Sequence, residues 1–200
     1  LAIGLGASLA LGGCAVNELG DLPSDLRGTL DASGSSAQGS AQEVWVAGFQ
    51  RLNASVTVNY DPAGSGAGRE AFLAGGTDFA GSDSPLSDDE LAGEFLGCAP
   101  ESRAIDLPLY ISPIAVIFKI DGVDELRISP DVLAAIFRGD IERWDDPAIV
   151  ALNPDASLPD AAITAVHRSD DSGTTKNFTD YLAQAAPEVW DEPAGDTFPY

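Results

Sequence analysis

Three loops of the sequence combine glycine with hydroxyl side chains in the way that anion-binding loops do. They contain Ser35-Ser36-Ala37, Gly64-Ser65-Gly66 and Ser172-Gly173-Thr174. Each is predicted to follow a strand and to open a helix, so free backbone N–H groups and the positive end of the helix dipole point outward. Glycine lets the backbone approach a ligand, and the hydroxyl donates a hydrogen bond. Together these features predict an anion site.

A charged pair precedes the third loop. Arg168 lies four residues before Ser172, and Asp170 lies between them. A planar guanidinium holds a tetrahedral oxyanion through two parallel hydrogen bonds, and a neighbouring carboxylate can fix its orientation. Arg168 is therefore a candidate ligand of the anion, with an ordinary surface arginine as the alternative.

The motifs of several enzyme classes are absent or incomplete. Residues 172–176 lack the Gly-Lys-Ser/Thr order of a P-loop, and residues 63–67 have alanine where a hydrolase nucleophile elbow has its outer glycines. The only histidine, His167, is interpreted as a partly buried filler, and one histidine argues against a two-metal phosphatase. We therefore expect no catalytic residue, no metal and no cofactor.

The charge balance restricts the ligand and its mode of binding. The sequence has 32 Asp and Glu against 10 Lys and Arg, a net charge of −22. Such a surface excludes nucleic acid, which requires a basic footprint. It also repels anions at long range, so an anion site has to be built locally from backbone N–H groups, hydroxyls and Arg168. The acidic surface itself is interpreted as a solubility feature.

The elements that position the loops follow an α/β order. Hydrophobic patterns predict strands and helices in alternation, which favours a largely parallel sheet. The expected strands are 29–31, 56–60, 77–80, 104–110, 114–120 and 163–166. The expected helices are 42–52, 69–74, 88–94, 131–137, 148–152 and 176–184. The two strands at 104–120 suit a crossover between lobes.

The first residues have the pattern of a secretory signal. Residues 1–13 are apolar, uncharged and too short to span a bilayer, and Leu11-Gly-Gly-Cys14 resembles a bacterial lipobox. We therefore expect residues 1–14 to be a signal peptide, Cys14 to carry lipid, and the polar residues 15–27 to be a tether. Cys98 then pairs outside this sequence or is a buried free thiol. The sequence is interpreted as truncated at both ends.

Three segments resemble the PstS-type family of phosphate-binding proteins. They are residues 133–154, residues 78–86 and residues 168–175, which occur in the family's order. The resemblance covers about residues 30–200. It implies a type II periplasmic-binding fold with two α/β lobes and a ligand cleft between them. Lobe one is expected at 28–110, and lobe two at 111–200 is expected to be incomplete.

The resemblance also implies which residues bind the ligand. The matching positions are Ser36, Ala37, Ser65, Asp83, Arg168, Ser172, Gly173 and Thr174, with Asp170 bracing the arginine. The family often has Thr-Phe where this sequence has Ser36-Ala37, so Ala37 is expected to contribute only its backbone.

The function implied is capture of inorganic phosphate for an ABC importer, without chemistry on the ligand. The expected partners are phosphate and the membrane subunits of the permease, at the outer face of the cytoplasmic membrane through the lipid anchor. One alternative is a binding protein for sulfate or molybdate. Another is a secreted phosphatase on the same scaffold. Asp83 favours phosphate, because a carboxylate accepts a hydrogen bond from a protonated oxyanion and sulfate carries no proton.

Overall fold

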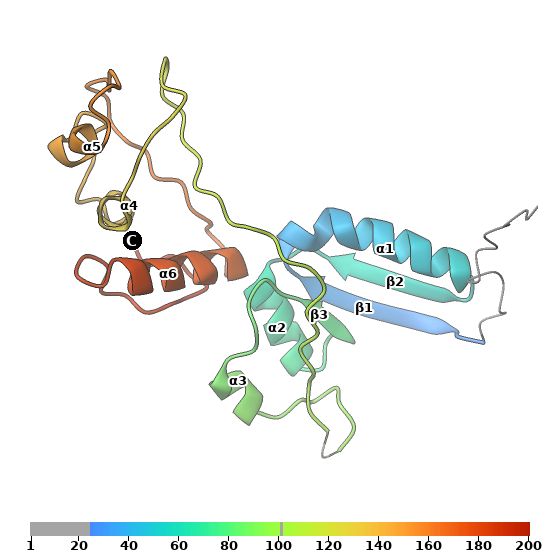
Figure 1. The fold of residues 1–200 in the computed structure, drawn as a ribbon. Helices are drawn as coiled ribbons and strands as arrows, with labels where there is room; N and C mark the ends of the chain where they lie inside the picture. Colours follow the sequence, from blue (N-terminus) through green and yellow to red (C-terminus); the bar gives the residue numbers. More distant parts are fainter. Residues whose placement is uncertain (1–24, 101) are drawn as a thin grey trace, which may run out of the picture.

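The computed structural model describes residues 25–100 and 102–200, which form two bodies joined by one connecting segment (Figure 1). The sheet lobe comprises residues 28–100, and the helical lobe comprises residues 129–200. Residues 102–128 run between them. The predicted signal peptide and most of the predicted tether lie outside the described residues.

A three-stranded parallel sheet organises the sheet lobe. Its strands are β1 (Gly28–Gly34), β2 (Val56–Asp61) and β3 (Phe79–Gly81), in the order β2-β1-β3. Both pairs are parallel, with Gly28 opposite Val56 at one end and Gly34 opposite Gly81 at the other. The predicted α/β class with a parallel sheet is confirmed.

Helices cover both faces of this sheet. After a short 3-10 turn, η1 (Ser36–Gln38), the chain forms α1 (Gly39–Leu52), α2 (Ser65–Leu73) and α3 (Asp88–Ala92). The path from β1 to β2 and then back across β1 to β3 reverses direction. Right-handed crossovers therefore place α1 and α2 on opposite faces, as Figure 1 shows.

The helical lobe packs around aromatic side chains. Its helices are α4 (Pro130–Arg138), α5 (Pro147–Leu152) and α6 (Gly173–Ala185), and Pro at the first turn and a capping Ser129 begin α4 as predicted. The core cluster joins α4 and α6 to the segment that follows α6. Its buried members are Ala134, Leu182, Ala186 and Trp190.

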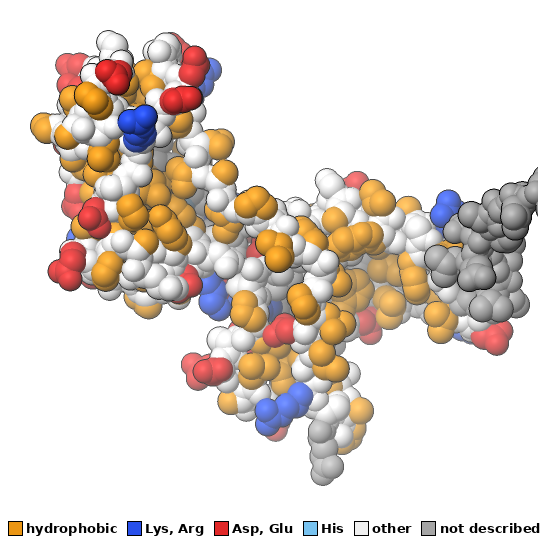
Figure 2. All heavy atoms as spheres, viewed as in Figure 1, with side chains coloured by type: hydrophobic (Ala, Val, Ile, Leu, Met, Phe, Trp, Pro, Cys, Tyr) orange, Lys and Arg blue, Asp and Glu red, His pale blue; other side chains and the backbone are white. Residues whose placement is uncertain are grey.

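The three strands predicted at 104–110, 114–120 and 163–166 are wrong. These segments have no strand structure, and in this part of the described chain pairing is limited to isolated bridges, Ile120 with Val123 and Arg143 with Ala162. Apolar, β-branched residues favour extended backbone, but a strand forms only where a neighbour pairs with its N–H and C=O groups. Their side chains are correspondingly exposed: Ile105 is 80% and Ile117 88% accessible. Figure 2 shows hydrophobic side chains at the surface between the lobes.

None of the helices in the described ranges has both the length and the hydropathy that crossing a membrane requires.

Candidate anion-binding site

The sheet topology brings the first loop and the residues after β3 together. Because β1 lies between β2 and β3, the chain changes direction there, and the carboxyl ends of β1 and β3 form a topological switch point. Ligand sites of open α/β sheets lie at such points. Ser35 directly follows β1 and Asp83 lies two residues after β3, so the two side chains meet at this edge.

Hydroxyl groups surround the Asp83 carboxylate. Ser35 Oγ lies 2.6 Å from Oδ1 and 2.7 Å from Oδ2 of Asp83, and Ser35 is fully buried. Ser65 Oγ and Thr174 Oγ1 lie 3.5 Å and 3.4 Å from Oδ2. We call these four side chains the Asp83 cluster. The carboxylate accepts hydrogen bonds and each of the three hydroxyls can donate or accept one, which suits a ligand that carries both oxygens and protons.

The second loop brings a helix N-terminus to the cluster. Gly64 adopts φ 106°, a conformation that favours glycine, and it precedes α2 without a side-chain cap. Ser65, the first residue of α2, is 1% exposed, and its Oγ accepts a hydrogen bond of 3.2 Å from the Asp83 backbone N–H. The start of α2, with its outward N–H groups and positive dipole end, therefore lies beside Asp83.

The third loop reaches the same place from the helical lobe. Gly173 begins α6 so close to the sheet lobe that a Cβ on it would lie 2.8 Å from Ser65 Oγ and 3.0 Å from Asp83 Cβ. Asn177 Nδ2 donates to the Asp83 backbone oxygen at 2.8 Å. Residues from both lobes thus enclose Asp83.

Arg168 pairs with Asp170, as predicted. Arg168 Nε donates to Asp170 Oδ1 at 2.6 Å, and a second nitrogen contacts Oδ2. The hydrogen bond that Arg168 donates to Asp170 raises the pKa of Arg168 against the opposing effect of burial, and the Asp170 and Asp83 charges raise it further. The same hydrogen bond lowers the pKa of Asp170. The pair is therefore fully charged near neutral pH and lies close enough to Asp83 to sense its charge.

The remaining predicted residues occupy less direct positions. Ser172 Oγ caps α6 by accepting from Thr175 N at 3.4 Å, and Ser36 is exposed. Ala37 N donates to Ser35 Oγ at 3.2 Å. The structure thus brings Ser65, Asp83, Gly173 and Thr174 together directly. The first loop contacts Asp83 through Ser35, which is the neighbour of the predicted Ser36.

Tyr60 is a member of the site's surroundings that sequence reasoning missed. Its hydroxyl donates to the Ser35 backbone oxygen at 2.9 Å. Burial, followed by the Asp83 charge, raises the pKa of Tyr60 to about 12, so this hydroxyl keeps its proton and remains a donor. The sequence feature that could have indicated Tyr60 is its position near the end of a predicted strand, since β2 pairs with β1 there.

The histidine prediction needs correction. His167 is exposed rather than partly buried, and its ring stacks on Phe198 at 4.1 Å between centroids. The apolar partner comes from the segment after α6, a contact that local sequence does not reveal.

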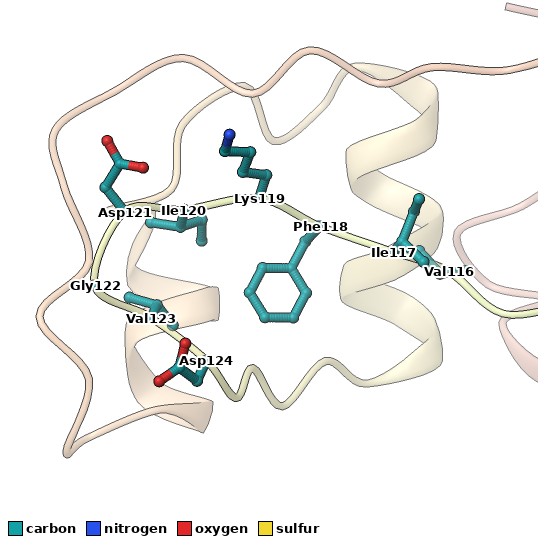
Figure 3. A pocket seen from close by; sticks show the side chains of 9 residues that line it. All are labelled: Val116, Ile117, Phe118, Lys119, Ile120, Asp121, Gly122, Val123 and Asp124. Atoms are coloured by element: carbon teal, nitrogen blue, oxygen red, sulfur yellow. The ribbon is translucent and has the colours of Figure 1, made fainter.

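A hollow of about 490 Å³ lies elsewhere, along residues 116–124 (Figure 3). All its lining residues belong to this one segment, and the side chains of Phe118 and Lys119 lie on opposite sides of the chain. Its one basic side chain, Lys119, is accompanied by Asp121 and Asp124. This composition is unsuited to an anion, and the Asp83 cluster remains the candidate site.

The model of the PBP superfamily domain matches residues 22–197. The chain belongs to the PBP superfamily. Among its members with similar sequences is phosphate-binding protein PstS 3 of Mycobacterium tuberculosis strain H37Rv, 45% identical over 170 residues, which are 85% of this chain and 45% of that protein. PstS of Pasteurella multocida is 35% identical over 169 residues, covering 84% of this chain and 46% of that protein. These matches bear out the resemblance to PstS-type proteins.

The superfamily fold is also found in a solved structure. A Clostridium perfringens protein assigned as a phosphate ABC transporter substrate-binding protein, crystallised with bound phosphate, aligns with a TM-score of 0.55 and 18% identity. The alignment covers 81% of this chain and 59% of that one. This chain spans less than half the length of the similar PstS sequences, 45% to 46%.

Proposed function

We propose that the full-length protein binds inorganic phosphate and delivers it to the membrane subunits of an ABC importer. The observation that carries the proposal is the Asp83 cluster, a carboxylate enclosed by Ser35, Ser65 and Thr174 beside the start of α2. The similarity of this chain to proteins named phosphate-binding protein PstS supports it.

The acceptor at the centre decides which oxyanion fits. A carboxylate repels a fully deprotonated anion such as sulfate. Phosphate carries an O–H group, from which Asp83 can accept a hydrogen bond. The hydroxyls, the N–H groups of α2 and Arg168 then donate to the other phosphate oxygens. The PstS relatives are named as binding proteins, so we expect the ligand to leave unchanged.

The direct test is calorimetric titration of the full-length protein with phosphate, arsenate and sulfate. Phosphate and arsenate are expected to bind, and sulfate is not. A chromogenic phosphate ester, with and without divalent metal, tests the phosphatase alternative in parallel. Hydrolysis of that ester, or sulfate binding as tight as phosphate binding, would contradict the proposal.

Removing the guanidinium should weaken binding. In the full-length protein, Arg168→Ala is expected to raise the Kd for phosphate by about tenfold or more, since a hydrogen bond to a charged group contributes roughly 1.5–3 kcal/mol. Calorimetry measures the change. Arg51→Ala, at an exposed position of α1, is the matched control and should leave the Kd as it was. Equal affinity in both variants would exclude Arg168 from the site.

We also propose that Cys14 carries a lipid that holds the protein at the outer face of the cytoplasmic membrane. The Leu-Gly-Gly-Cys sequence before it supports this. Two acyl chains anchor stably, whereas one binds only marginally. Cys14→Ala is therefore expected to move the full-length protein out of the membrane fraction, while Cys98→Ala leaves it there. A membrane-bound Cys14→Ala protein and no lipid mass on the wild type would refute the anchor.

A further inference from the structure

One buried arginine outside the predicted site connects the two lobes. Arg69 lies on α2 and is 6% exposed. Within the sheet lobe its Nε donates to Glu90 Oε1 at 3.0 Å, and one Nη donates to Ser84 Oγ at 3.0 Å and Ser82 Oγ at 3.3 Å. These two serines flank Asp83 in the chain, so Arg69 supports the loop that presents the acceptor carboxylate.

The remaining partner of Arg69 comes from the helical lobe. Asp196 accepts from the two terminal nitrogens of Arg69, with Oδ2 at 2.7 Å and Oδ1 at 3.4 Å. The residues are 127 positions apart in sequence. The Asp196 backbone oxygen also accepts from Ser172 N at 3.0 Å, so the same residue supports the third loop. One ion pair thus links the Asp83 loop to the loop that carries Gly173 and Thr174.

Separation of the lobes would take Asp196 away from the Arg69 guanidinium and leave it with Glu90. The side chains of Arg69 and Asp196 are 7% and 18% exposed, so water screens their attraction only in part. Burial lowers the pKa of Arg69, but the hydrogen bonds that it donates to Asp196 and Glu90 raise it above its usual value. Because a buried charge without its partner is costly, the pair favours the arrangement in which the lobes touch.

We propose that the Arg69–Asp196 pair is a latch between the lobes that slows the release of phosphate. The inference rests on the proposed function and adds two positioning residues that do not contact the ligand. A latch acts after the lobes have closed, so it governs the dissociation rate more than the association rate.

Asp196→Asn removes the charge of the latch and leaves the partners of Arg69 within the sheet lobe in place. In the full-length protein it is expected to release radiolabelled inorganic phosphate about tenfold faster than the wild type in a chase with unlabelled phosphate. The association rate should change by less than about twofold. Asp180→Asn, the same change at an exposed position of α6, is the control and should release phosphate at the wild-type rate.

A double-mutant cycle separates a latch from a general loss of structure. Arg69→Met should accelerate release, and adding Asp196→Asn to it should accelerate release little further. Arg69→Lys keeps the charge but not the planar fork, so its release rate should lie between the wild type and Arg69→Met.

Equal release rates in Asp196→Asn and Asp180→Asn would overturn the latch even if Arg69→Met did not fold. Independent effects of the two latch substitutions would overturn it as well. A wild-type protein that binds no phosphate would contradict the proposed function and the latch with it. A wild type that binds phosphate, with unchanged release from Asp196→Asn, would contradict the latch alone.

Discussion

Gly68→Ala is expected to destabilise the full-length protein by about 2 kcal/mol. A Cβ at Gly68 would lie 2.6 Å from the Ser33 carbonyl oxygen and would also overlap Gly34, so α2 would have to move away from β1. Overpacking against backbone costs about 3 kcal/mol, because no side chain can rotate away. The better helix propensity of alanine returns about 1 kcal/mol. Urea unfolding of the two proteins measures the difference.

Gly48→Ala is the matched control for this substitution. Gly48 lies inside α1, and a Cβ there would meet nothing within 4 Å. Alanine should therefore stabilise the protein by about 0.5–1 kcal/mol through helix propensity alone. If Gly68→Ala raised the unfolding midpoint as Gly48→Ala does, the prediction that a Cβ at Gly68 destabilises the contact between α2 and β1 would be wrong.

Local patterns were sufficient to predict the order of the elements in the sheet lobe. Residues 56–60 alternate in hydrophobicity and include the β-branched Val56, Thr57 and Val58, and they form most of β2. Ser87 and Ser129 begin helices by capping them, an interaction that is complete within four residues of sequence. Such elements are predictable because their stabilising contacts are local.

The predicted strands at 104–120 and 163–166 failed for the opposite reason. An apolar run specifies that side chains avoid water, but not which segment supplies the hydrogen-bond partners. Ile117, for example, is 88% exposed in a segment without strand structure. In these segments the hydrophobic pattern therefore predicted neither the burial of the side chains nor the pairing of the backbone.

The site was predictable as a set of loops but not at the level of single contacts. The combination of glycine with Ser or Thr predicted that Ser65, Gly173 and Thr174 belong to the site, and the structure places all three around Asp83. The choice between Ser35 and Ser36 depends on how η1 turns after β1, and that turn is set by tertiary packing. The contact between the lobes through Arg69 is not predictable from local sequence, because its partner Asp196 is 127 positions away.

The Asp83 carboxylate should be the main source of selectivity for phosphate over sulfate. It lies between hydroxyls of both lobes, with Ser35 Oγ 2.6 Å and Thr174 Oγ1 3.4 Å away. A protonated oxyanion can donate to it, whereas sulfate presents only lone pairs. Two like charges in contact at a desolvated site cost several kcal/mol, which is a penalty that attraction from Arg168 does not remove.

Asp83→Asn should therefore reduce the phosphate-to-sulfate affinity ratio of the full-length protein by at least about 100-fold, since 1.4 kcal/mol corresponds to a factor of ten. The amide removes the negative charge and offers an N–H that can donate to sulfate. Asp78→Asn makes the same chemical change where the carboxylate accepts from Asp31 N at 2.8 Å, and it should keep the wild-type ratio. Competition calorimetry gives the ratio for each variant. If Asp83 served only to shape its turn, Asp83→Asn would lower the unfolding midpoint and leave the ratio unchanged, and that result would refute its role in selectivity.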